Sequence, residues 1–267
     1  MRQGEKRALC WAIVFSCLCI CGAILLCSFF GRSLPRGTAD EEYLRDLITR
    51  VLCLIPLVIL MKECYPKYSL GLQREGFLQG ARISWLMYLY IAENFIEGSK
   101  VDTTIDIKGV PLCTYVLCLF AMLSVGVFEE ILFRGIVLQV LWEQIEDKKR
   151  GLYIAVFGSS FLFGVAHMFN YVAGHAYLRP TIAQVFYAMF LGIFMGAVYV
   201  TCNNLWVVIL LHGLFDFAAE FWEVATPNYS ISMQDVSWRV VGEWILLYLP
   251  LAIAGAYLTW KKAKELT

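Results

Sequence analysis

Two adjacent glutamates, Glu129 and Glu130, lie inside a long apolar stretch of the sequence. A charged side chain is costly in hydrocarbon, so one found there is by default a candidate for function. On a helix, Glu130 and Arg134 are four residues apart and can form an ion pair. Glu129 points about 100° away and has no partner on its own face. The spacing therefore predicts one neutralised carboxylate and one that is free to act as a general base.

Two of the three histidines also lie in apolar stretches: His167 follows Phe163 by four residues, and His212 precedes Asp216 by four. The second spacing puts His212 and Asp216 on one helical face, where the carboxylate can orient the imidazole by accepting its ring N–H. Histidine and carboxylate are also the ligands of catalytic zinc, which makes Glu129, His167 and His212 candidate metal ligands. A zinc mechanism and a metal-free glutamate mechanism use the same side chains, and both stay open.

Each of these features has a structural explanation when it is taken alone. A buried histidine can satisfy an interhelical hydrogen bond, and a Glu130–Arg134 pair can be purely structural. Two glutamates, two histidines and an aspartate on three apolar segments are harder to explain as unrelated, because bundle helices turn such side chains inward. The sequence contains no HExxH, GxSxG, Walker A or GxGxxG motif that would indicate another chemistry.

Membrane helices are the elements that must position these residues. The chain has 267 residues, of which 60% are hydrophobic and 16% are charged, whereas a soluble domain carries roughly a quarter charged residues. A lipid solvent explains this excess of apolar surface. The net charge is zero, so nucleic acid is not a favoured partner. We expect an all-α fold in which residues 1–267 form a single integral-membrane domain.

A membrane span needs about 20 apolar residues. The apolar run after Met1–Arg7 is longer than the core of a signal peptide and has no small-residue cleavage site, so we interpret it as a retained span. The segment 77–96 is interrupted by Arg82, Glu93 and Asn94, and 111–143 is long enough to be steeply tilted or to continue along the interface. The eight predicted spans are 8–30, 47–61, 77–96, 111–143, 151–169, 181–201, 205–221 and 240–260.

The positions of Lys and Arg predict that both termini are cytoplasmic, because cytoplasmic loops carry an excess of these residues. With eight spans, the inside segments hold twelve basic residues: Arg2, Lys6, Arg7, Lys62, Lys67, Arg74, Lys148, Lys149, Arg150, Lys261, Lys262 and Lys264. The outside segments, which include the loop with His175, hold six: Arg32, Arg36, Arg45, Lys100, Lys108 and Arg179, with Arg239 at a boundary.

The chain has ten cysteines, five of them in the first predicted span: Cys10, Cys17, Cys19, Cys21 and Cys27. They match no Cys/His zinc spacing. We interpret them as small apolar residues and expect no disulfide framework. Cys17 and Cys21 share a helix face, so a metal or a lipid attached there is the alternative.

The ordered motifs resemble those of the CAAX protease and bacteriocin-processing (CPBP) family of intramembrane proteases, which includes the type II CAAX prenyl endopeptidases. They lie on successive apolar segments within about residues 111–221, the motif-bearing core. In this sequence the motifs read Glu129-Glu130-Ile131-Leu132-Phe133-Arg134, Phe163-Gly164-Val165-Ala166-His167 and His212-Gly213-Leu214-Phe215-Asp216.

The resemblance implies an eight-helix bundle whose catalytic cavity opens toward the cytoplasm and laterally to lipid. It implies that Glu129 activates the attacking water, that His167 assists, and that His212 and Asp216 stabilise the oxyanion or complete the site. Glu130, Arg134 and Phe163 are the supporting residues by the same resemblance. The prenyl endopeptidases usually have Asn at the last position, and Asp is a familiar variant among the bacterial members. An ionised Asp216 cannot donate to an oxyanion as Asn does. Orienting His212 or binding a metal suits Asp216 better.

The expected function is hydrolysis of a peptide bond in a membrane-associated protein or peptide, with CAAX-type, leader or signal, and bacteriocin-like peptides as substrate classes. The expected location is the cell membrane, and a divalent metal such as zinc is a candidate cofactor. One alternative is a catalytically silent self-immunity or scaffold protein of the same fold. Another is a transporter with Glu129 and His212 as a proton relay, although the sequence shows no internal repeat of the transporter kind.

Overall fold

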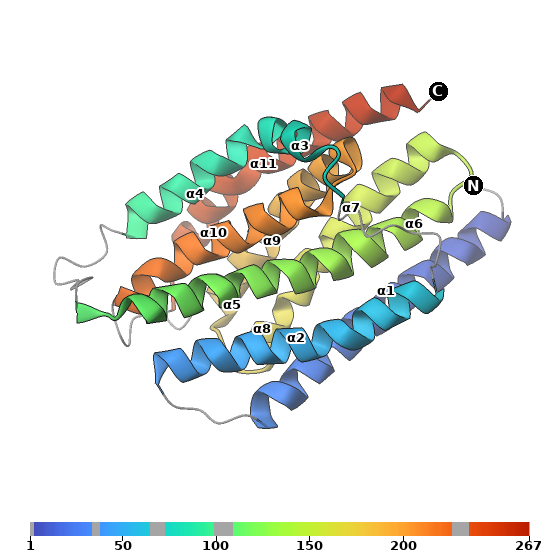
Figure 1. Ribbon diagram of the computed structural model, residues 1–267. Coiled ribbons are helices and arrows are strands. Elements are labelled where there is room, and N and C mark those ends of the chain that lie inside the picture. The colour runs from blue at the N-terminus through green and yellow to red at the C-terminus, as the bar shows by residue number, and fades with distance from the viewer. Residues whose placement is uncertain (1–2, 34–37, 65–72, 99–108, 226–234, 267) are drawn as a thin grey trace.

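The computed structural model describes residues 3–33, 38–64, 73–98, 109–225 and 235–266. In these ranges every regular element is a helix, which confirms the all-α prediction, and the long helices run side by side as one bundle (Figure 1). The helices are α1 Gln3–Ser33, α2 Ala39–Cys64, α3 Phe77–Ile83, α4 Trp85–Gly98, α5 Leu112–Glu130, the π-helix η2 Ile131–Leu138, α6 Gln139–Glu143, α7 Lys148–Ala166, α8 Met168–Val172, α9 Leu178–Cys202, α10 Leu205–Ala225 and α11 Trp238–Glu265.

Among the described residues, six helical stretches are long and apolar enough to cross a membrane, so the chain is a multi-pass membrane protein. They correspond to six of the eight predicted spans. The other two, 47–61 and 77–96, are helical but do not meet the same criterion of length and composition. α2 begins with an acidic first turn, and Ser84 divides the 77–96 segment into α3 and α4. Both lie within the bundle, α2 against α5 and α4 against α10 (Figure 1); their crossing of the membrane stays a prediction.

The predicted 111–143 segment is one continuous helical stretch whose winding changes in the middle. α5 ends at Glu130, the π-helix η2 follows, and α6 completes the stretch. All eight residues of η2 are buried, including Arg134. π-Helical turns are rare in proteins and frequently occur at functional sites. This one starts directly after the two glutamates. The apolar spacing of the sequence contains no signal for it.

A close contact between α5 and α10 brings the glutamates to His212. A Cβ added to Gly126 on α5 would lie 2.7 Å from the carbonyl oxygen of Ile209, and one added to Gly213 on α10 would lie 2.8 Å from Cα of Leu123. Backbone atoms in a packed interior cannot move aside as a flexible side chain does. The two glycines therefore set the separation at which α5 and α10 place their polar side chains.

The described cysteines do not form disulfides: the nine whose side chains are described are free. Cys10, Cys17 and Cys21 on α1 are exposed on the bundle surface, as expected for apolar residues that face lipid. Cys27 differs, because its Sγ lies 3.3 Å from Sγ of Cys53 and so joins α1 to α2.

Figure 1 shows both termini at one end of the bundle. The C-terminal end of α1, the N-terminal end of α2 and the C-terminal end of α10 lie at the opposite end (Figure 1). Which end faces the cytoplasm stays a prediction. Of the basic residues on which that prediction depends, five lie outside the described residues: Arg2, Arg36, Lys67, Lys100 and Lys108.

Candidate functional site

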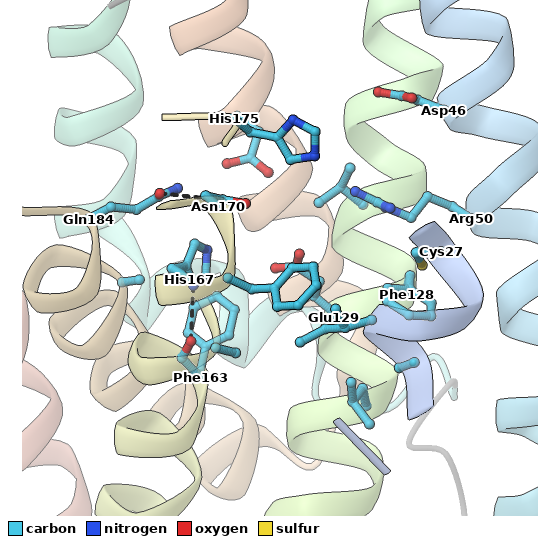
Figure 2. A pocket seen from close by; sticks show the side chains of 18 of the residues that line it. Cys27, Asp46, Arg50, Phe128, Glu129, Phe163, His167, Asn170, His175 and Gln184 are labelled. Atoms are coloured by element: carbon cyan, nitrogen blue, oxygen red, sulfur yellow. Dashed lines mark hydrogen bonds between the residues drawn. The ribbon is translucent and has the colours of Figure 1, made fainter. Parts of the chain in front are cut away.

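The three motifs meet at a cavity of about 630 Å³ that is lined by residues of α1, α2, α5, η2, α7, α8, α9 and α10. Its lining includes Glu129, Phe163, His167, His212 and Asp216, and Figure 2 shows the first three of these around the cavity. The remaining two predicted site residues lie behind this wall, fully enclosed by protein: Glu130 and Arg134. Helices that are far apart in the sequence thus bring all the predicted site residues into one region.

The Glu130 carboxylate links two helices. Its Oε1 lies 3.0 Å from Nη1 of Arg134, which is the ion pair predicted from the spacing of the two residues. The same oxygen accepts a 2.7 Å hydrogen bond from Nδ1 of His212 on α10. Because a carboxylate paired with a guanidinium is an acceptor, Nδ1 must carry the proton. The second contact runs between helices, so helical spacing could not predict it.

The Arg134 side chain is held mainly by charge and by an aromatic ring. Its guanidinium carbon lies 4.9 Å from the centre of the Phe163 ring, a cation–π contact. Nη1 and Nη2 of Arg134 and Oε2 of Glu130 have no aligned hydrogen-bond partner among the described residues. The 3.0 Å contact is therefore an ion pair by distance and not a well-directed hydrogen bond.

Phe163 separates the two histidines of the site. Its ring centre lies 4.9 Å from that of His167 and 5.8 Å from that of His212, edge-on in both cases. A third edge-on contact, 4.9 Å from the Phe133 ring, ties Phe163 to η2. This rigid aromatic contact fits the supporting position that the motif implied for Phe163.

The Nε2 atom of His212 faces two further carboxylates. It lies 3.4 Å from Oδ2 of Asp216 and 3.7 Å from Oε2 of Glu129. Because Nδ1 already donates to Glu130, a lone pair on Nε2 would point at two acceptor oxygens and be repelled. A proton is therefore held here, either on the imidazole or on one of the two carboxyl groups. Asp216 contacts the ring as its spacing predicted, but the short hydrogen bond that orients the imidazole comes from Glu130.

Exposure separates the carboxylates into two kinds. The Glu130 side chain is 0% exposed, whereas the side chains of Glu129 and Asp216 keep 21% and 27% of their surface accessible. Only the latter two can reach a molecule in the cavity. This matches the division that helical spacing predicted between a neutralised Glu130 and a free Glu129.

His167 lies where α7 ends and α8 begins. Its backbone N–H donates to the carbonyl of Gly164, so the Phe163 carbonyl loses the partner that a continuing α-helix would provide. The ring Nδ1 takes that place and donates to the Phe163 oxygen at 2.9 Å (Figure 2). Since a carbonyl can only accept, Nδ1 carries a proton and Nε2 is the nitrogen left for chemistry.

The candidate metal ligands are not arranged around a common point. Zinc requires its nitrogen and oxygen ligands at about 2.0–2.2 Å, and no three His, Cys, Asp or Glu side chains of the described ranges are grouped to hold a metal ion. The described arrangement of Glu129, His167 and His212 therefore does not fit a bound metal, and no step below uses one.

Sequence reasoning missed the wall of the cavity that α1 and α2 provide. Arg45, Thr49 and Arg50 of α2 line the cavity, as does Cys27 of α1. None of them belongs to a motif. The one signal in the sequence was a charged residue, Arg50, inside the predicted 47–61 span. His175, predicted in a loop, also lines the cavity (Figure 2).

Fold and site together define a polytopic helical membrane protein with a carboxylate–imidazole centre inside the bundle. Residues 111–218 match the family described as "Rce1-like: Type II CAAX prenyl endopeptidase Rce1-like". This part of the chain is thus an Rce1-like domain of the CPBP family, as its motifs predicted, and such membership implies an intramembrane protease. The comparisons with curated proteins and with solved structures gave no match.

The buried ion pair makes a first testable prediction. Arg134→Ala leaves the enclosed Glu130 without its cation, and we expect a loss of about 3–5 kcal/mol of stability, measured by thermal unfolding of the purified protein in detergent. The double variant Glu130→Gln/Arg134→Met should recover much of this loss, because it leaves no buried charge. Arg239→Ala is the matched control, since the Arg239–Glu243 pair is equally short but exposed. Equal effects of the two alanine substitutions would contradict the assignment.

Proposed function

We propose that this protein is an intramembrane endopeptidase that hydrolyses a peptide bond in a membrane-associated protein or peptide. The observation that carries the proposal is the pair of accessible carboxylates, Glu129 and Asp216, beside Nε2 of His212. Behind them, Glu130 and Arg134 are sealed from the cavity. The Rce1-like domain supports the same conclusion. CAAX-type, leader or signal, and bacteriocin-like peptides are the substrate classes to test.

In the proposed first step, Glu129 accepts a proton from a water molecule in the cavity. The water oxygen forms a bond to the carbonyl carbon of the peptide, and the carbonyl electrons move onto its oxygen. Protonated Nε2 of His212 is the available donor for this oxyanion. Nε2 of His167 carries no proton in the neutral ring, so it assists as an acceptor that helps to hold the attacking water. An ionised Asp216 cannot donate, so its part is to orient and stabilise the His212 ring.

In the second step the tetrahedral intermediate collapses. The carbonyl re-forms, the C–N bond breaks, and the leaving nitrogen takes the proton that Glu129 received from water. The products are a carboxylic acid and an amine, and Glu129 returns to its ionised form. Glu130 contributes indirectly, because its hydrogen bond to Nδ1 holds the imidazole in one tautomer and orientation.

We further propose that both termini are cytoplasmic and that the cavity opens on the opposite side. The excess of Lys and Arg in the segments near the termini supports the first part. The cavity lining comes from the second half of α1, the first halves of α2 and α9, and the centre and second half of α10. That is the half of the bundle away from the termini (Figure 1). A cytoplasmic opening, which the motif resemblance implied, is incompatible with cytoplasmic termini in this arrangement.

Substitution of the base tests the activity. We expect Glu129→Ala and His167→Ala to lower peptide cleavage by at least about 100-fold, while the protein inserts and unfolds as the wild type does. The assay incubates protein in lipid nanodiscs with the candidate peptides and detects products by mass spectrometry. Glu243→Gln, an exposed glutamate on α11, is the matched control. Cleavage that survives Glu129→Ala would remove the assigned base, and a folded wild type that cleaves none of the peptides would favour the silent immunity or scaffold alternative.

Chelation tests the metal question. Because the candidate ligands are not grouped, we expect cleavage to continue at an unchanged rate after incubation with EDTA or 1,10-phenanthroline. Added zinc should not increase it. Loss of activity on chelation, restored by zinc, would show that the ligands rearrange around a metal and that the proposed metal-free steps are incomplete.

Labelling from one side of the membrane tests the orientation. His175→Cys should react in intact cells with a membrane-impermeant maleimide, because His175 lies at the cavity and is exposed. Lys149→Cys, in the exposed first turn of α7, should react only after the membrane is permeabilised. Both variants are compared with the unsubstituted chain, whose native cysteines set the background. The reverse pattern would place the cavity on the cytoplasmic side.

A further inference from the structure

Three donor atoms of α2 residues that line the cavity have no hydrogen-bond partner. They are Nη1 of Arg45, Oγ1 of Thr49 and Nε of Arg50, all of them buried, although Nη1 of Arg45 lies 4.0 Å from Oε1 of Glu42 in an ion pair. Spacings of four and five residues place them on adjacent turns of one helix. Buried polar groups in folded proteins are nearly always hydrogen-bonded, so a row of three unpartnered donors facing a cavity indicates an acceptor that arrives from elsewhere.

Thr49 is the clearest member of this row. The residue is 3% exposed, yet its hydroxyl bonds nothing. A helical threonine can satisfy itself by donating to the carbonyl four residues earlier. Thr181 and Thr201 do so in this protein, at 2.7 Å each. The hydroxyl of Thr49 makes no such bond, although Thr49 is one of the residues that line the cavity.

Arg50 supplies the charge. Its guanidinium lies 5.7 Å from the centre of the Phe128 ring and beside the Cys27 thiol. Within the described ranges no ion pair joins it to a carboxylate, whereas Arg134 has Glu130 and Arg45 lies 3.5 Å from Asp46. Figure 2 shows the Arg50 side chain reaching from α2 into the cavity, between the level of Asp46 and that of Glu129.

The α5 and α10 helices, which lie beside α2, contribute acceptors to the cavity. Glu129, Asp216 and Glu220 line it from α5 and α10, and Glu220 already accepts a 2.9 Å hydrogen bond from the Tyr43 hydroxyl. Asp46 of α2 also lines the cavity, beside Arg45. Around Thr49 and Arg50, however, α2 presents donors, and an anion bound there is attracted to Arg50 and repelled by the carboxylates of the cavity.

We propose that Thr49 and Arg50, with Arg45 nearer the mouth, form a subsite that binds a carboxylate of the substrate peptide. This rests on the proposed function. A guanidinium presents its N–H donors in a plane that matches the two oxygens of a carboxylate, and the Thr49 hydroxyl adds a third donor. The anchored carboxylate holds the peptide so that a nearby amide lies at the level of Glu129. The carboxylate is either the C-terminus or an acidic side chain, and the experiment distinguishes them.

The experiment uses the full chain in nanodiscs and a fluorescent, N-terminally acylated peptide in three forms. One has a free C-terminal carboxylate and no acidic side chain, one has a C-terminal amide and one Glu, and one has the amide and no acid. Binding is measured with Glu129→Gln, so that it does not depend on cleavage, and kcat/KM is measured with the wild-type Glu129. We expect at least one acid-bearing form to bind about tenfold more tightly than the acid-free form.

Substitutions on α2 then test whether Arg50 and Thr49 cause the tighter binding of the acid-bearing peptides. Arg50→Gln should abolish it, Arg50→Lys should restore part of it, and Thr49→Val should reduce it a few-fold. Thr49→Val should leave thermal unfolding unchanged, because the hydroxyl has no bond to lose, so it tests the subsite even where Arg50→Gln unfolds the protein. Arg32→Gln is the matched control, since Arg32 lines the same cavity from an exposed position on α1 and its loss should keep the preference.

The outcomes separate the subsite from the enzyme activity. Equal binding of all three forms, or a preference that survives both Arg50→Gln and Thr49→Val, overturns the subsite whether or not any peptide is cleaved. If the preference for acid-bearing peptides depends on Arg50 but the wild type cleaves none of the peptides, the subsite is retained and the proposed endopeptidase activity is rejected. Preference for the free C-terminus identifies the terminal carboxylate, and preference for the Glu-bearing amide identifies the side chain.

Discussion

The Glu130 carboxylate carries no accessible surface and contacts two positively polarised groups, Arg134 on its own helical stretch and His212 on α10. An ion removed from water to this extent is stable only when its partners stay in place. The contact therefore constrains the rest of the site. Gly126 and Gly213 allow α5 and α10 to approach closely enough for it to form, and the π-helical turns that contain Arg134 begin at the next residue.

The hydrogen bond between Glu130 and His212 determines which groups the imidazole presents to the cavity. With Nδ1 of His212 donating to Glu130, Nε2 points to Glu129 and Asp216 and shares a proton with them. Nδ1 of the imidazole thus contacts the buried Glu130, and Nε2 faces the two accessible carboxylates, Glu129 and Asp216. A metal is poorly accommodated for another reason, since no three His, Cys, Asp or Glu side chains of the described residues are grouped to hold one.

The charges in the cavity are distributed unevenly between its walls. Glu129, Asp216 and Glu220 come from α5 and α10, within or next to the Rce1-like domain, and Asp46 comes from α2. The buried donor atoms without a hydrogen-bond partner, Oγ1 of Thr49 and Nε of Arg50, come from α2, outside residues 111–218. The Rce1-like domain thus carries the three motifs, and the preceding helices complete the wall of the cavity.

The sequence alone determined the membrane class, the helical fold, the three motifs and the Glu130–Arg134 pair, because apolar run length and helical spacing are local properties. It could not determine the hydrogen bond from His212 to Glu130, the π-helical winding of Ile131–Leu138 or the position of Thr49 and Arg50 on the cavity. Each of these depends on which helix faces which, and packing between helices distant in the sequence decides that. The sequence also permitted two incompatible expectations, cytoplasmic termini and a cytoplasmic cavity. Only the tertiary structure showed that the cavity and the termini lie in opposite halves of the bundle.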